Sequence, residues 1–238
     1  MIRKGIAVLA AALMASGAAY AAGDVSGTIS WEGKIPGRKA LKMQADPVCA
    51  SKHTGKVLSS RVVISPESKI ANVFVYVSKG LEGKSFDTPA EPAVLDQKGC
   101  LYEPKIMGVM AGQKIKVLNS DGTLHNVHPK PKVNKEFNLA MPKFMKVKEI
   151  LIEKPEVMIP VKCDVHPWMS AHIGVMSHPH FNVSSEDGSF SLKGVPAGSY
   201  TVTAWHEVFG SKSVDVTVAD GGSVTADFSY NIEDAKRK

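Results

Sequence analysis

The sequence predicts an all-β protein built from two antiparallel β-sandwiches. Gly and Pro, with 20 and 14 residues, punctuate the whole chain, and no long stretch repeats apolar residues at helical spacing. Short runs that alternate in polarity or are rich in β-branched residues recur between these breaks. Without its first 21 residues the chain has 238 − 21 = 217 residues, which suits two small domains.

The N-terminus has the pattern of a secretory signal peptide. Arg3 and Lys4 precede an apolar run from Gly5 to Ala18, and Ala19-Tyr20-Ala21 supplies a small-residue cleavage site. We therefore predict a signal peptide over 1–21 and a periplasmic or secreted mature protein, with a retained N-terminal anchor as the alternative. No later stretch approaches the roughly 20 apolar residues of a membrane-spanning helix, so no span is expected in the mature chain.

The charge balance argues against nucleic acid as a partner. Cleavage after residue 21 removes two of 29 basic and none of 23 acidic residues, so the mature net charge is 27 − 23 = +4. The excess is spread along the chain without interleaved aromatic residues, and export separates the protein from nucleic acid. A basic surface could steer an acidic redox partner, or it could simply be a solvated face.

Seven segments are predicted as strands from their alternation or their β-branched residues. They comprise residues 25–31, 73–77, 114–118, 149–152, 157–161, 200–205 and 214–218.

The connections between these strands are predicted from Gly, Pro and polar residues. Residues 32–70 indicate a long excursion with little regular structure, 78–92 a linker, and 130–145 a loop. Pro160 lies three residues before Cys163. Because proline cannot donate to a strand ladder, we expect it at an edge or a bulge.

Two stretches carry the chemistry of a metal site. Within seven residues, Cys163, His166 and Met169 offer a thiolate, an imidazole and a thioether, and His125 offers a second imidazole upstream. Two His, one Cys and a weak axial Met suit copper, whereas zinc seldom takes a thioether. The pair Cys163-x-x-His166-Pro167-x-Met169 and His125-Asn126-Val127-His128 resembles the cupredoxin family, with the amicyanin and plastocyanin branch as the nearest match.

This resemblance implies a type-1-like site with one copper ion. His125, Cys163 and His166 would be the trigonal ligands and Met169 the axial one, while Asn126 would tie the His125 strand to the Cys163 loop. The family also implies that His166 lies near the surface in an apolar patch that docks redox partners, a cytochrome or a dehydrogenase. Pro167 and Trp168 would stand on its rim, or Trp168 would be a packed loop residue.

Three cysteines in an exported chain leave one over if two of them pair. If Cys163 holds the metal, then Cys49 and Cys100 are the natural disulfide, although spacing cannot show that they come within reach.

The last part of the chain resembles a different family. Asp187-Gly188-Ser189-Phe190 and Pro196-Ala197-Gly198-Ser199-Tyr200 are similar to turns of the carboxypeptidase regulatory-like domain, a small prealbumin-type β-sandwich. Opening strands typical of that family stand at the N-terminus, before the copper motifs. We therefore expect N-terminal strands in 22–92, a cupredoxin domain in 93–177 and the regulatory-like sandwich in 178–238. The cupredoxin is either inserted between the second and third strands of the other sandwich or follows an N-terminal extension in tandem.

The expected function is single-electron transfer by an exported blue-copper protein, not enzymatic catalysis, because four protein ligands leave no open position for a substrate. A copper delivery or sequestration protein is the alternative, and a structural or carbohydrate-contacting sandwich with a stabilising metal is a third. Further His and Met residues could form a second copper site, or the histidines could be solvated and the methionines could fill the core. These residues are His128, His172, His178, His180, Met107, Met110, Met141, Met145 and Met176.

Overall fold

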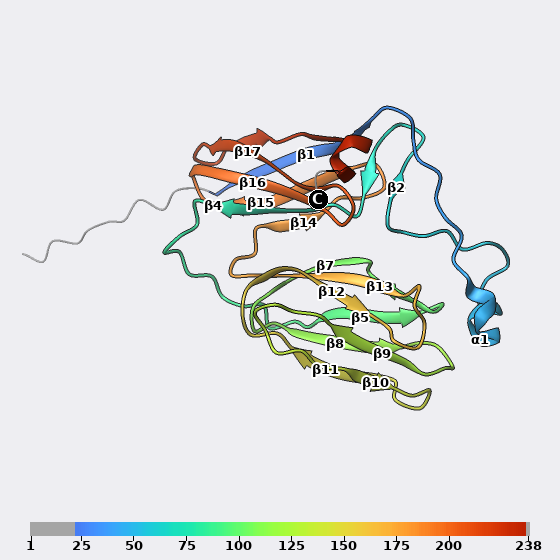
Figure 1. Ribbon diagram of the computed structural model, residues 1–238. Helices are drawn as coiled ribbons and strands as arrows, with labels where there is room; N and C mark the ends of the chain where they lie inside the picture. Colours follow the sequence, from blue (N-terminus) through green and yellow to red (C-terminus); the bar gives the residue numbers. More distant parts are fainter. Residues whose placement is uncertain (1–21, 237–238) are drawn as a thin grey trace, which may run out of the picture.

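The computed structural model describes residues 22–236. The predicted signal peptide, residues 1–21, lies outside the described residues. Figure 1 shows two β-sandwiches, one above the other, with a long irregular segment running along one side of both. The fold class expected from the sequence, all-β with two sandwiches, is confirmed. Among the described residues, no helix has both the length and the apolar character needed to cross a membrane.

One sandwich, which we call the host sandwich, is assembled from both ends of the chain. One of its sheets has the order β15-β1-β18, with β19 also paired to β1, and the other has the order β14-β4-β16-β17. The strands β1 and β4 precede the second sandwich in sequence, and β14 to β19 follow it. The strands are β1 (Gly23–Glu32), β4 (Phe74–Lys79), β14 (Phe181–Val183), β15 (Ser189–Val195), β16 (Gly198–His206), β17 (Gly210–Val218), β18 (Ser223–Thr225) and β19 (Phe228–Asn231).

The other sandwich, which we call the inserted sandwich, lies between β4 and β14 in sequence. Its sheets have the orders β10-β9-β12-β13-β7 and β11-β8-β5-β6. The structure thus has the inserted rather than the tandem arrangement. The strands are β5 (Ala93–Lys98), β6 (Leu101–Glu103), β7 (Ile106–Met110), β8 (Lys114–Asn119), β9 (His125–Pro129), β10 (Leu139–Met141), β11 (Val147–Leu151), β12 (Glu156–Lys162) and β13 (Ser170–Met176).

The sequence predicts antiparallel sandwiches, but four strand pairs of the described residues are parallel. They are β5 with β8, β7 with β13, and β1 with both β18 and β19. Parallel neighbours need long crossover connections. In the inserted sandwich the chain forms strands of the other sheet between the two members of each parallel pair, and between β1 and its partners β18 and β19 it forms the whole inserted sandwich.

The irregular segment after β1 contains little regular structure, as expected. It holds η1 (Met43–Ala45), α1 (Pro47–Ala50), β2 (Val63–Ile64) and β3 (Ile70–Ala71); a second 3-10 helix, η2 (Ile232–Lys236), follows β19. Asp46 caps α1 because its carboxylate accepts hydrogen bonds from the backbone N–H of Val48 and Cys49, and Pro47 occupies the first helical position.

Two local features differ from the sequence expectation. The predicted loop 130–145 contains the short strand β10, because Leu139–Met141 pairs in register with β9. Pro160 lies in β12, which has a neighbouring strand on each side. Because β12 pairs with β9 only at Val161 and Lys162, Pro160 lies just beyond the end of that pairing. A bulge between Glu156 and Ile159 precedes it.

The sandwiches touch through two glycines on adjacent strands. Gly108 of β7 pairs with Gly174 of β13, and the fully buried Phe74 of β4 packs over both positions. A Cβ atom at Gly108 would approach the ring of Phe181 to 2.4 Å, and one at Gly174 would approach Phe74 to 2.7 Å. The missing side chains therefore allow the aromatic residues of the host sandwich to lie directly on the inserted sheet.

Candidate metal centre

The predicted ligands are positioned by β9 and by the loop between β12 and β13. His125 is the first residue of β9, and Cys163 directly follows β12. The loop closes on itself because the Met169 N–H donates to the His166 carbonyl at 2.9 Å and the Cys163 N–H to the Met169 carbonyl at 3.3 Å. Since β9 and β12 pair at Lys162 and His128, the loop stands beside the start of β9.

Three of the predicted ligands come together in the core. The donor atoms of His125, Cys163 and His166 all lie within 4.8 Å of one another, and all three residues are buried. The Nδ1 atoms of the two imidazoles are 3.0 Å apart, and His166 Nδ1 is 3.9 Å from Cys163 Sγ. One soft sulfur and two imidazole nitrogens converging on one point is a donor set that fits copper.

The fourth predicted ligand, Met169, is buried in the same apolar cluster as Cys163. The two backbone hydrogen bonds of the loop hold its main chain next to that of Cys163.

Asn126 makes the cross-link that the sequence comparison implied. Its Oδ1 accepts a hydrogen bond from the Asp164 N–H at 2.8 Å and lies 3.3 Å from Cys163 Sγ. Its Nδ2 donates to Asn138 and to the Asp164 carboxylate. The residue therefore ties the start of β9 to the loop that carries Cys163.

Two carboxylates that sequence reasoning missed complete the centre. Each imidazole turns its second nitrogen to a carboxylate: His125 Nε2 lies 3.0 Å from Asp121 Oδ2, and His166 Nε2 lies 2.9 Å from Asp46 Oδ2. A carboxylate on the far nitrogen fixes the orientation of a metal-ligating imidazole and makes it more basic. Asp121, four residues before His125, was a detectable candidate, whereas no sequence signal connects Asp46 to His166.

The buried Asp121 is held ionised by its partners. Burial raises its pKa, but hydrogen bonds from His125 and from the backbone N–H of Cys100 and Gly99 outweigh burial and lower the pKa to about 2. His125 responds in the opposite direction: burial lowers its pKa, and Asp121 and Cys163 raise it to about 8.

Cys163 is the free cysteine, and its surroundings favour the thiolate. Burial raises its pKa, whereas hydrogen bonds from His125 and from backbone groups of the loop lower it to about 7. The hydrogen bond from His166 likewise lowers the pKa of Asp46. The surroundings therefore favour the thiolate form of Cys163 beside two imidazoles, His125 and His166, whose orientation is fixed by carboxylates.

A segment from the irregular region covers the centre, and we call residues 39–58 the cover segment. Cys49 of this segment forms a disulfide with Cys100, and the two cysteines are 51 residues apart in sequence. Cys49 Sγ also lies 3.5 Å from His166 Nε2, and His166 is only 2% exposed. The expectation that His166 lies near the surface is therefore wrong, because it assumed a site completed by the inserted sandwich alone.

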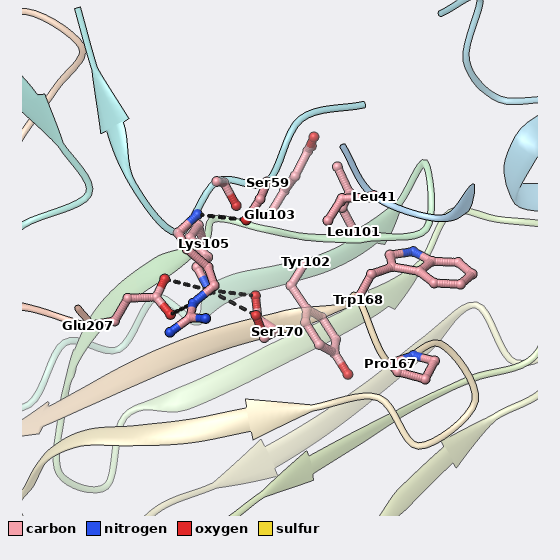
Figure 2. A pocket seen from close by; sticks show the side chains of 12 residues that line it. Leu41, Ser59, Leu101, Tyr102, Glu103, Lys105, Pro167, Trp168, Ser170 and Glu207 are labelled. Carbon is pink, nitrogen blue, oxygen red and sulfur yellow. Dashed lines mark hydrogen bonds and ion pairs between the residues drawn. The ribbon is translucent and has the colours of Figure 1, made fainter. Parts of the chain in front are cut away.

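Trp168 is half-buried between the centre and a pocket. Its ring centroid is 5.1 Å from that of His166, and its Nε1 donates to the Cys100 carbonyl at 3.1 Å. Figure 2 shows Trp168 and Pro167 at one end of the pocket, with Lys105, Ser170 and Glu207 towards the other. The pocket has a volume of about 550 Å³ and is lined by Leu41 of the cover segment, by residues 59–61 that follow this segment, and by residues of both sandwiches.

The remaining histidines are not gathered into a second site. Among His, Cys, Asp and Glu of residues 22–236, the groups of three with donor atoms within 4.8 Å all include His125 or His166. The interpretation of the other histidines as solvated is wrong for His178 and His180, which are 5% and 3% exposed. Their rings bond the carbonyls of Val77 and Lys193, because this turn is packed where the chain returns to the host sandwich.

A comparison with family models agrees with the resemblance to the carboxypeptidase regulatory-like domain. The model of the carboxypeptidase regulatory-like domain matches residues 170–231, which begin at β13 of the inserted sandwich and continue to the end of β19. The comparison with curated proteins gave no match.

Several solved structures resemble part of the chain. A purple cupredoxin from Nitrosopumilus maritimus is 19% identical over 35% of this chain and 98% of its own, with a TM-score of 0.30. An amicyanin variant in the Cu(I) state is 22% identical over 37% of this chain and 86% of its own, with a TM-score of 0.32. A copper-containing nitrite reductase from Thermus scotoductus is 20% identical over 41% of this chain and 24% of its own, with a TM-score of 0.31. Part of the chain thus matches the model of the carboxypeptidase regulatory-like domain, and each of the solved structures named above is similar to part of the chain at under 25% identity.

Proposed function

We propose that this protein is an exported blue-copper protein that carries single electrons between redox partners. The observation that supports the proposal is the convergence of His125, Cys163 and His166 on one buried point. These side chains, with Met169 as the axial ligand, would hold one copper ion, which supplies a reversible one-electron couple when bound. The protein's own contribution is to keep the donors in place.

Several groups keep the donors from moving. Asp121 and Asp46 orient the two imidazoles, and Asn126 fixes the thiolate loop to β9. A ligand set that moves little when the oxidation state changes lowers the reorganisation that accompanies electron transfer. Because four protein side chains would hold the ion and the three grouped donors are buried, the arrangement would leave no position for a substrate, and we propose that the protein is not an enzyme.

The cellular context belongs to the same proposal. The N-terminal pattern suits export to the periplasm or to the outside, where a thiol pair such as Cys49 and Cys100 is oxidised. The redox partner would be a protein such as a cytochrome or a dehydrogenase, and the host sandwich would act as a spacer or docking module.

The test is the visible spectrum of the mature protein loaded with copper. We expect one equivalent of Cu(II) to give an intense thiolate-to-copper band, with loss of this band in Cys163→Ser and in His125→Gln. His128→Gln is the matched control, because His128 lies on the same strand but bonds Asp164 and Glu136 instead of entering the donor cluster. A colourless, readily exchanged Cu(I) site would favour copper delivery, and preferential retention of zinc would favour a structural metal.

A further inference from the structure

The imidazole that should face a redox partner is closed off by the cover segment. Asp46 and Cys49 both contact His166 Nε2, at 2.9 and 3.5 Å, and the ring is buried. Electron tunnelling through protein slows steeply with distance, so a partner needs close approach to a group in contact with the ligands. The His166 ring edge does not offer that approach in this structure.

The cover segment is attached at several points, so it is not a loose lid. The disulfide joins Cys49 to Cys100, and His53 Nε2 bonds the Gly99 carbonyl at 2.8 Å. Lys52 Nζ lies 3.5 Å from the buried carboxylate of Asp121. At its base, the Leu41 N–H donates to the Val57 carbonyl at 2.8 Å. Electron exchange therefore requires a route other than the covered edge.

Trp168 provides such a route. Its indole packs against the His166 ring on one side, is held by the Cys100 carbonyl, and lines the pocket on the other side. The lining of this pocket includes the exposed residues Arg61 and Glu103, so the pocket reaches the protein surface. Figure 2 shows the indole at the end of the pocket that lies beside Pro167.

We infer that the indole of Trp168, which lines this pocket, is the group through which an electron passes between the proposed copper site and its redox partner. The inference rests on the proposed function. In each exchange one electron crosses, the partner is oxidised or reduced by one unit, and no bond or proton changes place.

The test is the oxidation of the reduced, copper-loaded protein by hexacyanoferrate(III), followed by stopped-flow absorbance. In Trp168→Leu we expect the second-order rate constant to fall about tenfold, which corresponds to about 1.4 kcal/mol in activation free energy. Trp168→Phe, which keeps an aromatic ring, should stay close to the wild type. The visible band and the reduction potential of each variant show whether the site itself has changed.

Phe144→Leu is the matched control, because Phe144 is 79% exposed and is the rival aromatic contact for a partner. Its rate should equal that of the wild type. An unchanged rate in Trp168→Leu with an intact band, or a larger loss in Phe144→Leu, would overturn the inference.

A second variant leaves the indole in place. Ser59→Leu would narrow the pocket with an aliphatic side chain, and we expect it to slow the oxidation, whereas Ser223→Leu on the distant strand β18 should not. If Ser59→Leu keeps the wild-type rate, the inference is wrong even where Trp168→Leu fails to bind copper. A wild-type protein without a visible band would instead refute the proposed function.

Discussion

Each imidazole of the centre presents one nitrogen to the donor cluster and the other to a carboxylate. The pairs His125–Asp121 and His166–Asp46 have nearly the same nitrogen–oxygen distances, 3.0 and 2.9 Å. A carboxylate makes an imidazole a stronger donor, and this favours Cu(II), the more charged ion, over Cu(I). The two aspartates should therefore influence both the affinity for copper and the reduction potential.

Asp121→Asn tests this effect on the more deeply buried pair. We expect the affinity for Cu(II) to fall about 10- to 100-fold, the range typical of lost outer hydrogen bonds to metal ligands, and the reduction potential to rise. A competition titration for Cu(II) and a voltammogram provide the two measurements. Asp215→Asn in the host strand β17 is the control, and equal affinities for the two variants would contradict the role of Asp121.

A residue-level pH effect is expected from His178, away from the metal centre. Burial lowers its pKa from 6.5 to about 4, while the hydrogen bond to Val77 opposes the shift only in part. The unfolded chain then binds the proton more readily than the folded chain. Stability is therefore full above pH 6.5 and falls as the pH drops towards 4, by about 3 kcal/mol at 1.36 kcal/mol per pKa unit.

Urea unfolding of the wild type and of His178→Gln between pH 4 and 8 measures this contribution. The difference between the two proteins should shrink or reverse towards pH 4, because glutamine does not titrate. A difference that stays constant over this range would show that His178 does not contribute to the acid sensitivity.

At the scale of elements, the cover segment depends on one covalent link. Residues 39–58 contain only short helical turns, and their packing onto the inserted sandwich is anchored by Cys49–Cys100. In the chain-entropy model, a bridge that closes a loop of this length stabilises the folded state by about 4 kcal/mol, and measured bridges give about 2–4 kcal/mol.

The double variant Cys49→Ser, Cys100→Ser should lose about 2–4 kcal/mol of unfolding free energy, measured by urea denaturation. Hydrogen exchange in 47–58 should rise, while exchange in β16 and β17 of the host sandwich should not. Uniformly raised exchange would mean that the bridge stabilises the whole molecule rather than the cover segment.

Seven of the nineteen strands of the described residues could be predicted from the sequence, because alternation and β-branched residues are local properties. The seven predicted strands all correspond to strands of the structure. The other strands, many of them short, were missed; β10, for example, has three residues that pair in register with β9 and carry no alternation of their own. The cover over His166 was missed for a similar reason, since no local pattern links residue 46 to residue 166.

At the scale of the molecule, two kinds of contact help to hold the sandwiches together. One is the aromatic contact over Gly108 and Gly174. The other is ionic: Lys105 Nζ lies 2.9 Å from Glu207 Oε1 and also bonds Ser170, and both charged side chains are nearly buried. Burial lowers the pKa of Lys105, and the neighbouring Glu207 opposes the shift. Together these contacts fix the pocket beside Trp168.

Gly174→Ala tests the aromatic contact. The added Cβ would meet Met158 Cε at 2.4 Å and the Phe74 ring at 2.7 Å; the end of the methionine side chain can shift, but the fully buried ring has no space to yield, so we expect a loss of about 1–3 kcal/mol in unfolding free energy. Gly37→Ala is the control, because a Cβ there meets nothing within 4 Å. Equal stabilities in thermal unfolding would mean that the interface adjusts without cost.

The sequence by itself determined seven of the strands, the two-sandwich architecture and the loop that carries Cys163, His166 and Met169, because these depend on residues near one another in the chain. Only the tertiary structure decided that a distant segment brings Asp46 and a disulfide onto His166, and that two glycines allow the sandwiches to pack closely. Such contacts join residues far apart in sequence, and their energy arises from burial and pairing that no local pattern contains.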